Sequence, residues 1–291
     1  MQDRERDPFH RRTADPSVLV PWLAELARNV PGLVRSYLPG GPLDPRSREQ
    51  VILAVTEVNG CRYCAWIHGS WADYLGGLDD PADALEALLT YARASAEAGH
   101  PLSTDSLADA IPPEVLASLR ATVAQIEVAN LVGNTVDGLL ARATRRRPLD
   151  PMRAAGELAT VALALPIAVP MLAVGGALRL MRSLAPDVPT VQMPPAGEAN
   201  LLVHLLAKAV PSYLGNAGLR LALLRLPVPV AFAIKAGRTA ATVRIGAGEV
   251  VVDNGISPDA LVVVEGDVEP LLQLATGHLV REIGTLRVKR P

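Results

Sequence analysis

The feature that most constrains the fold is a change in hydrophobic period late in the chain. Up to about residue 226, apolar residues recur every three or four positions, as on a helix that buries one face. Beyond it, the segment VPVAFAIK alternates apolar and other residues, which is the period of a strand. A helical period cannot place one apolar face on a strand, nor a strand period on a helix, so the sequence predicts an all-α part followed by an α+β part. The alternating apolar positions are Val228, Val230, Phe232 and Ile234.

Length and charge favour two domains and exclude one class of partner. The 291 residues, 49% of them hydrophobic, can bury at least one sizeable core and are expected to form two. The formal net charge is -2 and the one basic cluster, Arg145 to Arg147, is short, so nucleic acid is not an expected partner. The start, MQDRERDPFHRR, lacks the apolar core of a secretory signal, so a cytoplasmic protein is expected.

Capping and breaking residues divide the first half into helices. Asp44 or Ser47 can cap a helix that contains REQVILAVTEV and ends at Asn59-Gly60. The next helix is expected from about Cys61 to Tyr74. Further helices are expected from Asp80-Pro81 to Gly99, in a short segment from Ser103, and from Pro113 to about Arg142.

An uncharged stretch runs from Leu158 to Leu178, long enough to raise the question of a membrane span. Pro166, Pro170 and Gly175-Gly176 interrupt it, and arginine flanks both ends, so no orientation is indicated. Three interpretations stay open: a buried or inter-subunit helical hairpin, which is favoured, attachment to a membrane surface, and a true span. The Pro-rich APDVPTVQMPPAGE that follows is expected to be a linker.

Three more strands are expected after VPVAFAIK, in TAATVRI, EVVVD and LVVVE. The loops between them are of hairpin length and carry glycine, which favours an antiparallel meander. The segment GDVEPLLQLATG then predicts a helix from about Asp267 to Gly277, and TLRVKR is expected to return as an edge strand.

The only two cysteines, Cys61 and Cys64, stand three residues apart. In a reducing compartment they are more suited to reactivity or metal binding than to a structural disulfide. On a helix, offsets of three and seven residues are rotations of about 300° and 700°, so His68 shares a face with both thiols. The break at Asn59-Gly60 puts the cysteines in the first helical turn, where free N–H groups and the helix dipole favour thiolate.

Glu49 is the candidate acid or base on the preceding helix, twelve residues before the first cysteine. Partial desolvation there would make it a usable proton donor or acceptor if the two helices pack side by side. His68, one turn after the second cysteine, can accept or hold a proton during the exchange. Glu49 is expected in an apolar neighbourhood, sharing a face with Ile52, Leu53 and Thr56.

Two other interpretations of the cysteines stay open. Cys, Cys and His are good zinc ligands, but a structural site needs four and no further cysteine exists, so no metal or other cofactor is expected. Alternatively, both cysteines are inert helix residues and His68 is a satisfied core histidine. The remaining residues are expected to serve at the surface, in packing or in subunit contacts: His100, His204, His278, Trp66 and Trp71.

The pattern Glu49, eleven residues, CxxC, three residues, His68 resembles the alkylhydroperoxidase AhpD-like branch of the carboxymuconolactone decarboxylase superfamily. The similarity extends to about Ala143 and includes IEVANLVGNTVDGLLARA. The resemblance implies an all-helical domain over residues 1–148, association as trimers or hexamers, and thiol-dependent peroxide reduction.

Carried onto this chain, the resemblance makes Cys64 the attacking thiolate, oxidised by peroxide to a sulfenic acid, and Cys61 the residue that closes the disulfide. Glu49 and His68 would relay the proton through a water. Members of the family have a histidine in this relay between the cysteines. Here that residue is Tyr63, whose hydroxyl passes a hydrogen bond but seldom ionises near pH 7. The decarboxylases of the superfamily typically lack the cysteine pair, so lactone decarboxylation is disfavoured.

Residues from about Pro227 to Arg290 resemble the sterol carrier protein 2-like (SCP2-like) fold, in the order of elements and in a few residues. The resemblance implies helices covering a sheet around an apolar tunnel for fatty acyl or sterol-like ligands. The leucines between Leu201 and Leu226 either line such a tunnel or fill a core. The expected organisation is a redox domain (1–148), a hydrophobic connector with a Pro-rich linker (149–197) and an SCP2-like domain (198–291). The residues behind this resemblance are Asp259, Asp267, Leu271, Leu272 and Gly277.

Together these patterns predict a thiol-dependent peroxidase that forms homo-oligomers, uses an unknown thiol reductant and has lipid hydroperoxides as candidate substrates. The alternative is a non-enzymatic lipid carrier or membrane-peripheral protein whose helical domain serves oligomerisation. A protein disulfide reductase without peroxidase activity would use the same cysteines.

Overall fold

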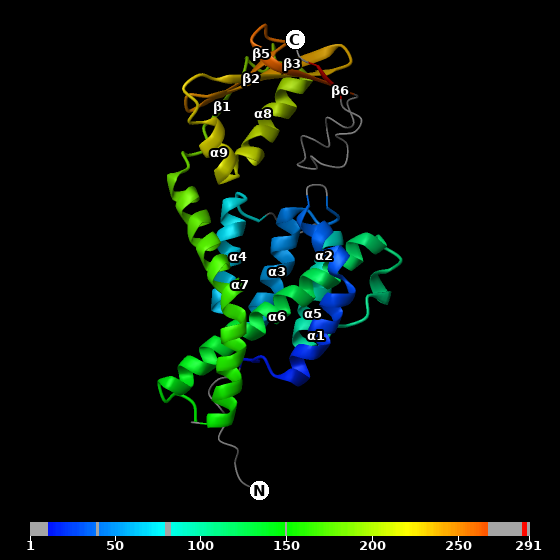
Figure 1. Cartoon of the computed structure of the whole chain (residues 1–291). Coiled ribbons are helices and arrows are strands. Elements are labelled where there is room, and N and C mark those ends of the chain that lie inside the picture. The colour runs from blue at the N-terminus through cyan, green and yellow to red at the C-terminus, as the bar shows by residue number, and fades with distance from the viewer. Residues whose placement is uncertain (1–10, 39–40, 79–82, 149, 267–286, 290–291) are drawn as a thin grey trace. The chain divides into compact units, whose positions relative to one another are not determined.

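The computed structural model describes residues 11–38, 41–78, 83–148, 150–266 and 287–289. Its contacts divide the chain into two compact units, called here the helical unit (Met1–Ala72 with Leu78–Leu178) and the sheet unit (Asp73–Gly77 with Arg179–Pro291). The described elements are helices up to residue 184, then a sheet with two helices (Figure 1). The prediction of a helical part followed by an α+β part is confirmed at this level. The division falls inside one long helix.

The helical unit is organised around its long central helix, α6. Four helices pack directly on α6: α1, α2, α3 and α5. Their shared core includes Val51, Val55, Leu119 and Val123, each fully buried. The helices of this part of the chain are α1 (Pro16–Arg28), α2 (Val30–Tyr37), α3 (Pro45–Asn59), α4 (Arg62–Tyr74), α5 (Asp83–Ala98), the 3-10 helix η1 (Asp105–Leu107), α6 (Pro113–Ala143) and α7 (Pro151–Leu184).

The predicted helix boundaries agree closely with the structure. The Asp44 side chain accepts hydrogen bonds from the backbone N–H groups of Arg46 and Ser47, so Asp44 is the cap of α3. Gly60 ends α3 in the left-handed conformation with φ 65°, which glycine adopts without strain. The expected helix start at Asp80-Pro81 lies outside the described residues.

The sheet unit contains one six-stranded sheet, in the order β1-β4-β3-β2-β5-β6. The strands β2, β3 and β4 form the expected antiparallel meander, and β6 pairs antiparallel with β5 at the sheet edge as predicted. The expected linker, however, also supplies a strand, because β1 pairs in parallel with β4. The elements are β1 (Val191–Gln192), α8 (Leu201–Leu214), α9 (Ala217–Leu223), β2 (Val230–Ala236), β3 (Thr239–Gly246), β4 (Glu249–Asn254), β5 (Ala260–Gly266) and β6 (Arg287–Lys289).

The prediction that β5 continues the meander is wrong, because β5 pairs in parallel with β2. The outer edge of β4 is already occupied by β1, which leaves the free edge of β2 for β5. The connection is held across β3: Thr242 Oγ1 donates to Gly255 O (2.8 Å) and accepts from Ser257 N (2.9 Å). Arg244 Nη2 donates to Ser257 Oγ (2.6 Å). These hydrogen bonds hold the connection between β4 and β5 in place where it crosses the sheet.

The helix α8 covers one face of this sheet (Figure 1). Its apolar residues fill a core with β3 and β4, and Val203 and Leu214 are almost fully buried. The expected face of β2 is only partly right, since Val228 precedes the strand and is 71% exposed while Ala233 on the other face is fully buried. The helix expected from Asp267 to Gly277, with Leu271 and Leu272, and His278 after it, lies outside the described residues.

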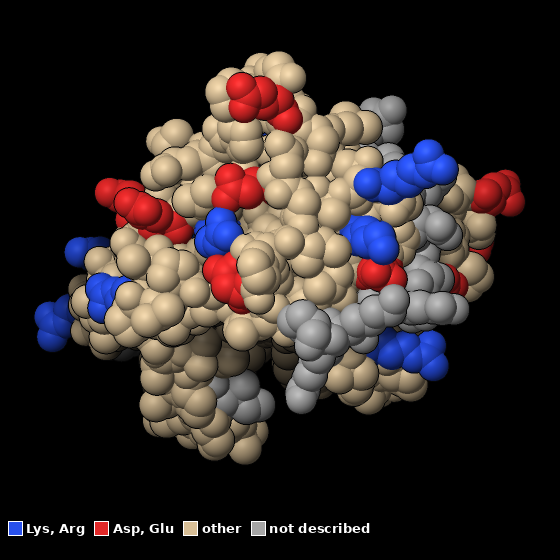
Figure 2. Space-filling model, turned by 90° about the horizontal axis from the view of Figure 1, so that it is seen from above, with Lys and Arg blue, Asp and Glu red and all other residues tan. Residues whose placement is uncertain are grey.

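Charged side chains on the face in Figure 2 lie singly or in small groups of mixed sign among uncharged residues. The described residues on this face show no extended patch of one sign, and the formal net charge of the chain is -2. This face therefore offers no electrostatic surface for a polyanion.

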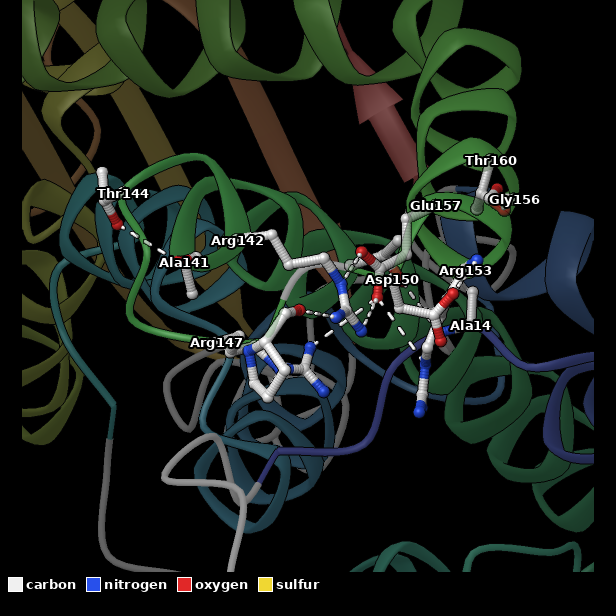
Figure 3. A network of polar contacts seen from close by, with 12 residues as sticks. Ala14, Ala141, Arg142, Thr144, Arg147, Asp150, Arg153, Gly156, Glu157 and Thr160 are labelled. Carbon is white, nitrogen blue, oxygen red and sulfur yellow. Dashed lines mark hydrogen bonds and ion pairs between the residues drawn. The ribbon is translucent and has the colours of Figure 1, made fainter.

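A buried ion network fixes the start of α7 to the end of α6 (Figure 3). Glu157, 6% exposed, accepts from Arg142 Nε at 2.9 Å and from Arg142 Nη2 at 3.2 Å. Arg147 Nη1 lies 3.7 Å from the same carboxylate, and Arg142 Nη1 donates to Pro148 O at 2.6 Å. Because the carboxylate is held by two buried guanidinium groups, the turn between the helices has one defined geometry.

The uncharged stretch from Leu158 to Leu178 forms the middle of α7. Its two halves, Pro151–Pro166 and Ala168–Leu184, are bent by 55° and together have the length and apolarity of a span. The expected hairpin is wrong, because the two halves form one bent helix and the chain does not turn back. The stretch is also not buried within the chain, since Leu163 is 82% exposed, and its burial between subunits stays a prediction. As a single described helix, only α6 is long and apolar enough to cross a membrane, and most of its apolar window is buried in the core.

Candidate active site

The two cysteines lie where α3 ends and α4 begins. Cys61 directly precedes α4, and its carbonyl accepts the hydrogen bond from Ala65 N at 2.9 Å. The thiols are free, buried, and 2.7 Å apart between sulfur atoms. Cys64 N–H also donates to Cys61 Sγ at 3.4 Å, as at a helix N-cap. The predicted position of the pair in the first turn of a helix is therefore what the structure has.

The two thiols hold their protons unequally. The hydrogen bond from the Cys64 thiol lowers the pKa of Cys61 more than burial raises it. The same hydrogen bond, together with burial, raises the pKa of Cys64. The first proton lost by the pair therefore leaves a thiolate on Cys61. The attacking role that the family resemblance gives Cys64 stays a prediction, and it requires Cys64 to pass its own proton to a base.

The structure brings Glu49 and His68 together across α3 and α4. His68 Nδ1 lies 2.7 Å from Glu49 Oε2, and both side chains are buried, at 9% and 2% exposure. Because a carboxylate only accepts hydrogen bonds, Nδ1 is the donor in this contact. His68 follows Cys64 by four residues on α4, so its ring lies one turn along the same face.

The surroundings of Glu49 correct one expectation, because its neighbourhood is not only apolar. Arg48, 4% exposed, places Nε 3.5 Å from Glu49 Oε1. Arg48 is itself fixed by donating to Ser36 O at 2.6 Å and by lying 4.2 Å from the centre of the Tyr37 ring. Arg48 directly precedes Glu49 in the sequence, but its burial beside the carboxylate was not expected. Glu49 can therefore carry negative charge away from water.

Tyr63 points to a different set of partners. Its hydroxyl donates to Asp137 Oδ1 at 3.0 Å and accepts from Arg62 Nη2 at 2.8 Å, and burial raises its pKa. Arg11 Nη1 binds the other oxygen of Asp137 at 2.7 Å. Within the described residues no hydrogen bond joins the Tyr63 hydroxyl to either thiol or to the Glu49–His68 pair, although the Tyr63 backbone N–H contributes to the lowered pKa of Cys61. Asp137, which the sequence reasoning missed, is thus the partner of the residue between the cysteines.

The helix α6 approaches the cysteines through a glycine. A Cβ atom at Gly133 would lie 2.5 Å from Cys61 Sγ and 3.8 Å from Cys64 Sγ. The next residue, Asn134, donates from Nδ2 to Asn59 O at 2.9 Å, which fixes the end of α3. The absence of a side chain at Gly133 therefore leaves room for the sulfur atoms. These residues lie in VANLVGNT, where the small and polar residues recur at helical spacing on a helix that is otherwise apolar.

Glu127 is a second buried carboxyl that the sequence reasoning missed. It is 0% exposed, and within the described residues neither carboxyl oxygen makes a hydrogen bond of good geometry. Burial raises its pKa to about 7, against the opposing effects of a side-chain hydrogen bond with Asn59 and the positive charge of Arg12. Arg12 Nη2 is bound to Asn59 Oδ1 at 3.1 Å. A lone glutamate within an apolar helical period is the only signal in the sequence, and it does not reveal burial.

The described residues contain no group of three or more His, Cys, Asp or Glu side chains arranged to hold a metal ion. His100 and His204 are exposed, as expected for surface residues. A scan against protein-family models and searches of curated proteins and of solved structures found no match to this chain. The functional argument therefore rests on the motif and on the geometry of the two thiols, Glu49 and His68.

Proposed function

We propose that this protein is a thiol-dependent peroxidase of the AhpD-like kind. The observation that carries the proposal is the arrangement of two free thiols 2.7 Å apart at the start of α4, with a buried Glu49–His68 pair one turn along that helix. A thiol pair at this spacing can form a disulfide with little movement, since the S–S bond is about 2.05 Å. The carboxylate–imidazole pair supplies the acid and base that peroxide cleavage needs.

In the first step, Cys64 gives its proton to His68, and Glu49 stabilises the imidazolium. The Cys64 thiolate then attacks the terminal oxygen of ROOH, so that an S–O bond forms and the O–O bond breaks. The departing RO⁻ takes the proton from His68 and leaves as ROH. Cys64 is now a sulfenic acid.

In the second step, Cys61 attacks the sulfur of the sulfenic acid as a thiolate. An S–S bond forms and the S–O bond breaks, and the hydroxide leaves as water with the proton that Cys61 lost. Two electrons from an external thiol reductant then restore both thiols.

Mass spectrometry of the protein after one equivalent of peroxide tests the proposal, and we expect a Cys61–Cys64 crosslink. In Cys61→Ser we expect a sulfenic acid on Cys64 that reacts with dimedone. Cys64→Ser should lose peroxide-dependent thiol oxidation altogether. If oxidation persists in Cys64→Ser at the wild-type rate, the proposed attack by Cys64 is wrong.

A protein disulfide reductase is the second candidate, and one observation favours it. The thiol with the lowered pKa is Cys61, the first of the motif, which suits attack on an external disulfide. This candidate would be favoured if the protein reduced an unfolded disulfide-bonded peptide and added peroxide did not slow that reduction. A mixed disulfide trapped on Cys61 in Cys64→Ser would identify the attacking residue.

The remaining assignments belong to the same proposal. Lipid hydroperoxides are the proposed substrates because the C-terminal segment resembles a lipid-binding fold and occurs in the same chain as the dithiol motif. Turnover of small and lipid peroxides at equal rates would argue against them. A trimer or hexamer is the proposed assembly, which light scattering tests. If Cys64→Ser retained bound lipid while no peroxide were consumed by wild type, the carrier alternative would replace the peroxidase.

A further inference from the structure

The surface of α7 between Leu158 and Leu178 is apolar on every side that the chain leaves open. Exposed fractions are 58% for Leu158, 82% for Leu163 and 57% for Val169. This is more apolar surface than single exposed side chains provide, so it requires an explanation. Further exposed apolar side chains in this stretch are Leu165, Leu172 and Val174.

The buried positions of α7 mark the one side that packs on the helical unit. Glu157 and Gly175 are eighteen residues, or about five turns, apart and so lie on the same side, with Leu178 about 60° away. A Cβ at Gly175 would lie 2.6 Å from the ring of Trp66 on α4, and Leu178 is 6% exposed. At 100° per residue, Leu158, Leu163 and the other exposed apolar positions lie about 60° to 120° to either side of Glu157. A helix for a single protein partner carries one apolar stripe with a polar remainder, which α7 lacks.

No side chain in this stretch requires a polar environment. The only side chain with a polar group between Leu158 and Leu178 is Thr160, and its hydroxyl donates back to Gly156 O at 3.0 Å. The two prolines within the helix, Pro166 and Pro170, bring no N–H group to satisfy. Hydrocarbon can therefore surround the middle of α7 without leaving a side-chain donor or acceptor unpaired.

Charge at the ends of the stretch indicates which membrane and which orientation. Exposed arginines occur before it, at Arg145, Arg146 and Arg153, and after it, at Arg179 and Arg182. Of these, Arg153 lies 3.9 Å from the buried Glu157 and Arg182 is paired with Asp73, so the positive charge of these two is partly offset. Both ends of the stretch are thus cationic, which matches headgroups of one anionic leaflet rather than opposite sides of a bilayer. The 55° bend and the attachment of both ends to the helical unit also oppose a straight crossing.

We propose that the middle of α7 docks on an anionic lipid bilayer, lying in the interface with its arginines at the headgroups. This surface goes beyond the proposed peroxidase function and does not depend on it. The contact of Gly175 with Trp66 joins α7 to the helix that carries Cys64. If the peroxidase function also holds, docking brings the thiol pair to a lipid surface.

Co-flotation of the full chain with vesicles tests the docking. We expect wild type to float with phosphatidylcholine vesicles that contain phosphatidylglycerol, and to bind pure phosphatidylcholine or vesicles in high salt much more weakly. The variant Leu163→Glu with Val169→Glu should bind at least about tenfold more weakly. The matched control is Leu261→Glu on β5, at a position 60% exposed, which should bind like wild type.

A second measurement covers misfolding of the double variant. Leu163→Trp keeps the surface apolar, and its added fluorescence should shift to shorter wavelength when anionic vesicles are added. Equal binding of wild type and the double variant, or no binding by wild type, would overturn the proposal. The proposal would also be overturned if wild type formed an oligomer and bound no lipid, and if the double variant did not form that oligomer. A second copy of the chain would then cover α7. Oxidation of the thiols by small peroxides should be unchanged in the double variant, which separates this test from that of the peroxidase function.

Discussion

Two buried carboxyl groups in the helical unit have opposite environments. Glu49 on α3 is 2% exposed and contacts His68 and Arg48, whereas Glu127 on α6 is 0% exposed and has no ion-pair or imidazole partner among the described residues. Burial raises the pKa of Glu127 to about 7. Burial alone therefore does not identify a group that moves protons during a reaction. The partner decides, because only Glu49 has an imidazole to share a proton with and a thiol one turn beyond it.

Replacing Glu49 with Gln has the largest expected effect on the rate of disulfide formation and tests the difference between the two carboxyl groups most directly. We expect Glu49→Gln to lower the rate of peroxide-dependent disulfide formation by about 10²- to 10⁴-fold, the usual contribution of general acid–base catalysis. Glu127→Gln should change that rate by less than about twofold, because its carboxyl has no imidazole or thiol partner. Stopped-flow measurement of thiol loss compares the two variants, with circular dichroism to verify folding. Equal losses in both would mean that Glu127 also serves the reaction.

Glu127→Gln sharpens the comparison through stability. Burial raises the pKa of Glu127 from 4.5 to about 7, so between these values the folded protein keeps a proton that the unfolded chain releases. Wild-type stability should therefore fall as pH rises through this window, by about 3 kcal/mol in total. Glu127→Gln should lose this pH dependence. Urea unfolding below and above the window measures the difference, and a wild-type free energy of unfolding that does not fall would contradict it.

Gly133 tests the part of α6 that contacts the thiols rather than the part that holds Glu127. Gly133→Ala puts a Cβ 2.5 Å from Cys61 Sγ, so we expect a loss of about 1–3 kcal/mol and a changed rate of disulfide formation. The control is Gly69→Ala on α4, where nothing lies within 4 Å. That change should stabilise the helix by about 0.5–1 kcal/mol. Thermal unfolding of both variants is the measurement, and a neutral Gly133→Ala would show that the contact relaxes freely.

Tyr63→Phe has the smallest expected effect. The change removes the hydroxyl that donates to Asp137 and accepts from Arg62, which should cost about 0.5–1.5 kcal/mol of stability. The rate of thiol oxidation should stay within about twofold of wild type, because the hydroxyl contacts neither Glu49 nor His68. A loss of rate comparable to that of Glu49→Gln would place Tyr63 in the proton relay after all.

Local signals predicted the frame of the site correctly. Asp44 caps α3, Gly60 ends it, and the spacing of the CxxC motif and His68 puts three side chains on one face of α4. These features depend on residues within one or two turns of each other, so the sequence contains all the information they need. The pairing of Glu49 with His68 depended on the packing of α3 on α4, and the motif predicted it through the family resemblance.

The partners from distant segments were beyond local patterns. Asp137 beside Tyr63 and Gly133 against Cys61 each join residues that lie far apart in the sequence. Arg48 directly precedes Glu49, but its burial there depends on its contacts with Ser36 and Tyr37. In the sheet, β1 occupies the edge of β4, so β5 pairs with β2. The alternation of apolar residues predicts a strand but not which strand it pairs with. The exposure of α7 could not be predicted either, because an apolar sequence does not show whether other residues pack on it.

The sequence by itself determined the helical and strand periods, the caps, the helix break before Cys61 and the shared face of Cys61, Cys64 and His68. Only the tertiary structure decided that Glu49 receives an imidazole partner, that Gly133 leaves room for the thiols and that the apolar surface of α7 is exposed. The reason is physical: backbone hydrogen bonds and side-chain spacing act over a few residues, whereas burial and charge pairing depend on which surfaces meet when the helices pack.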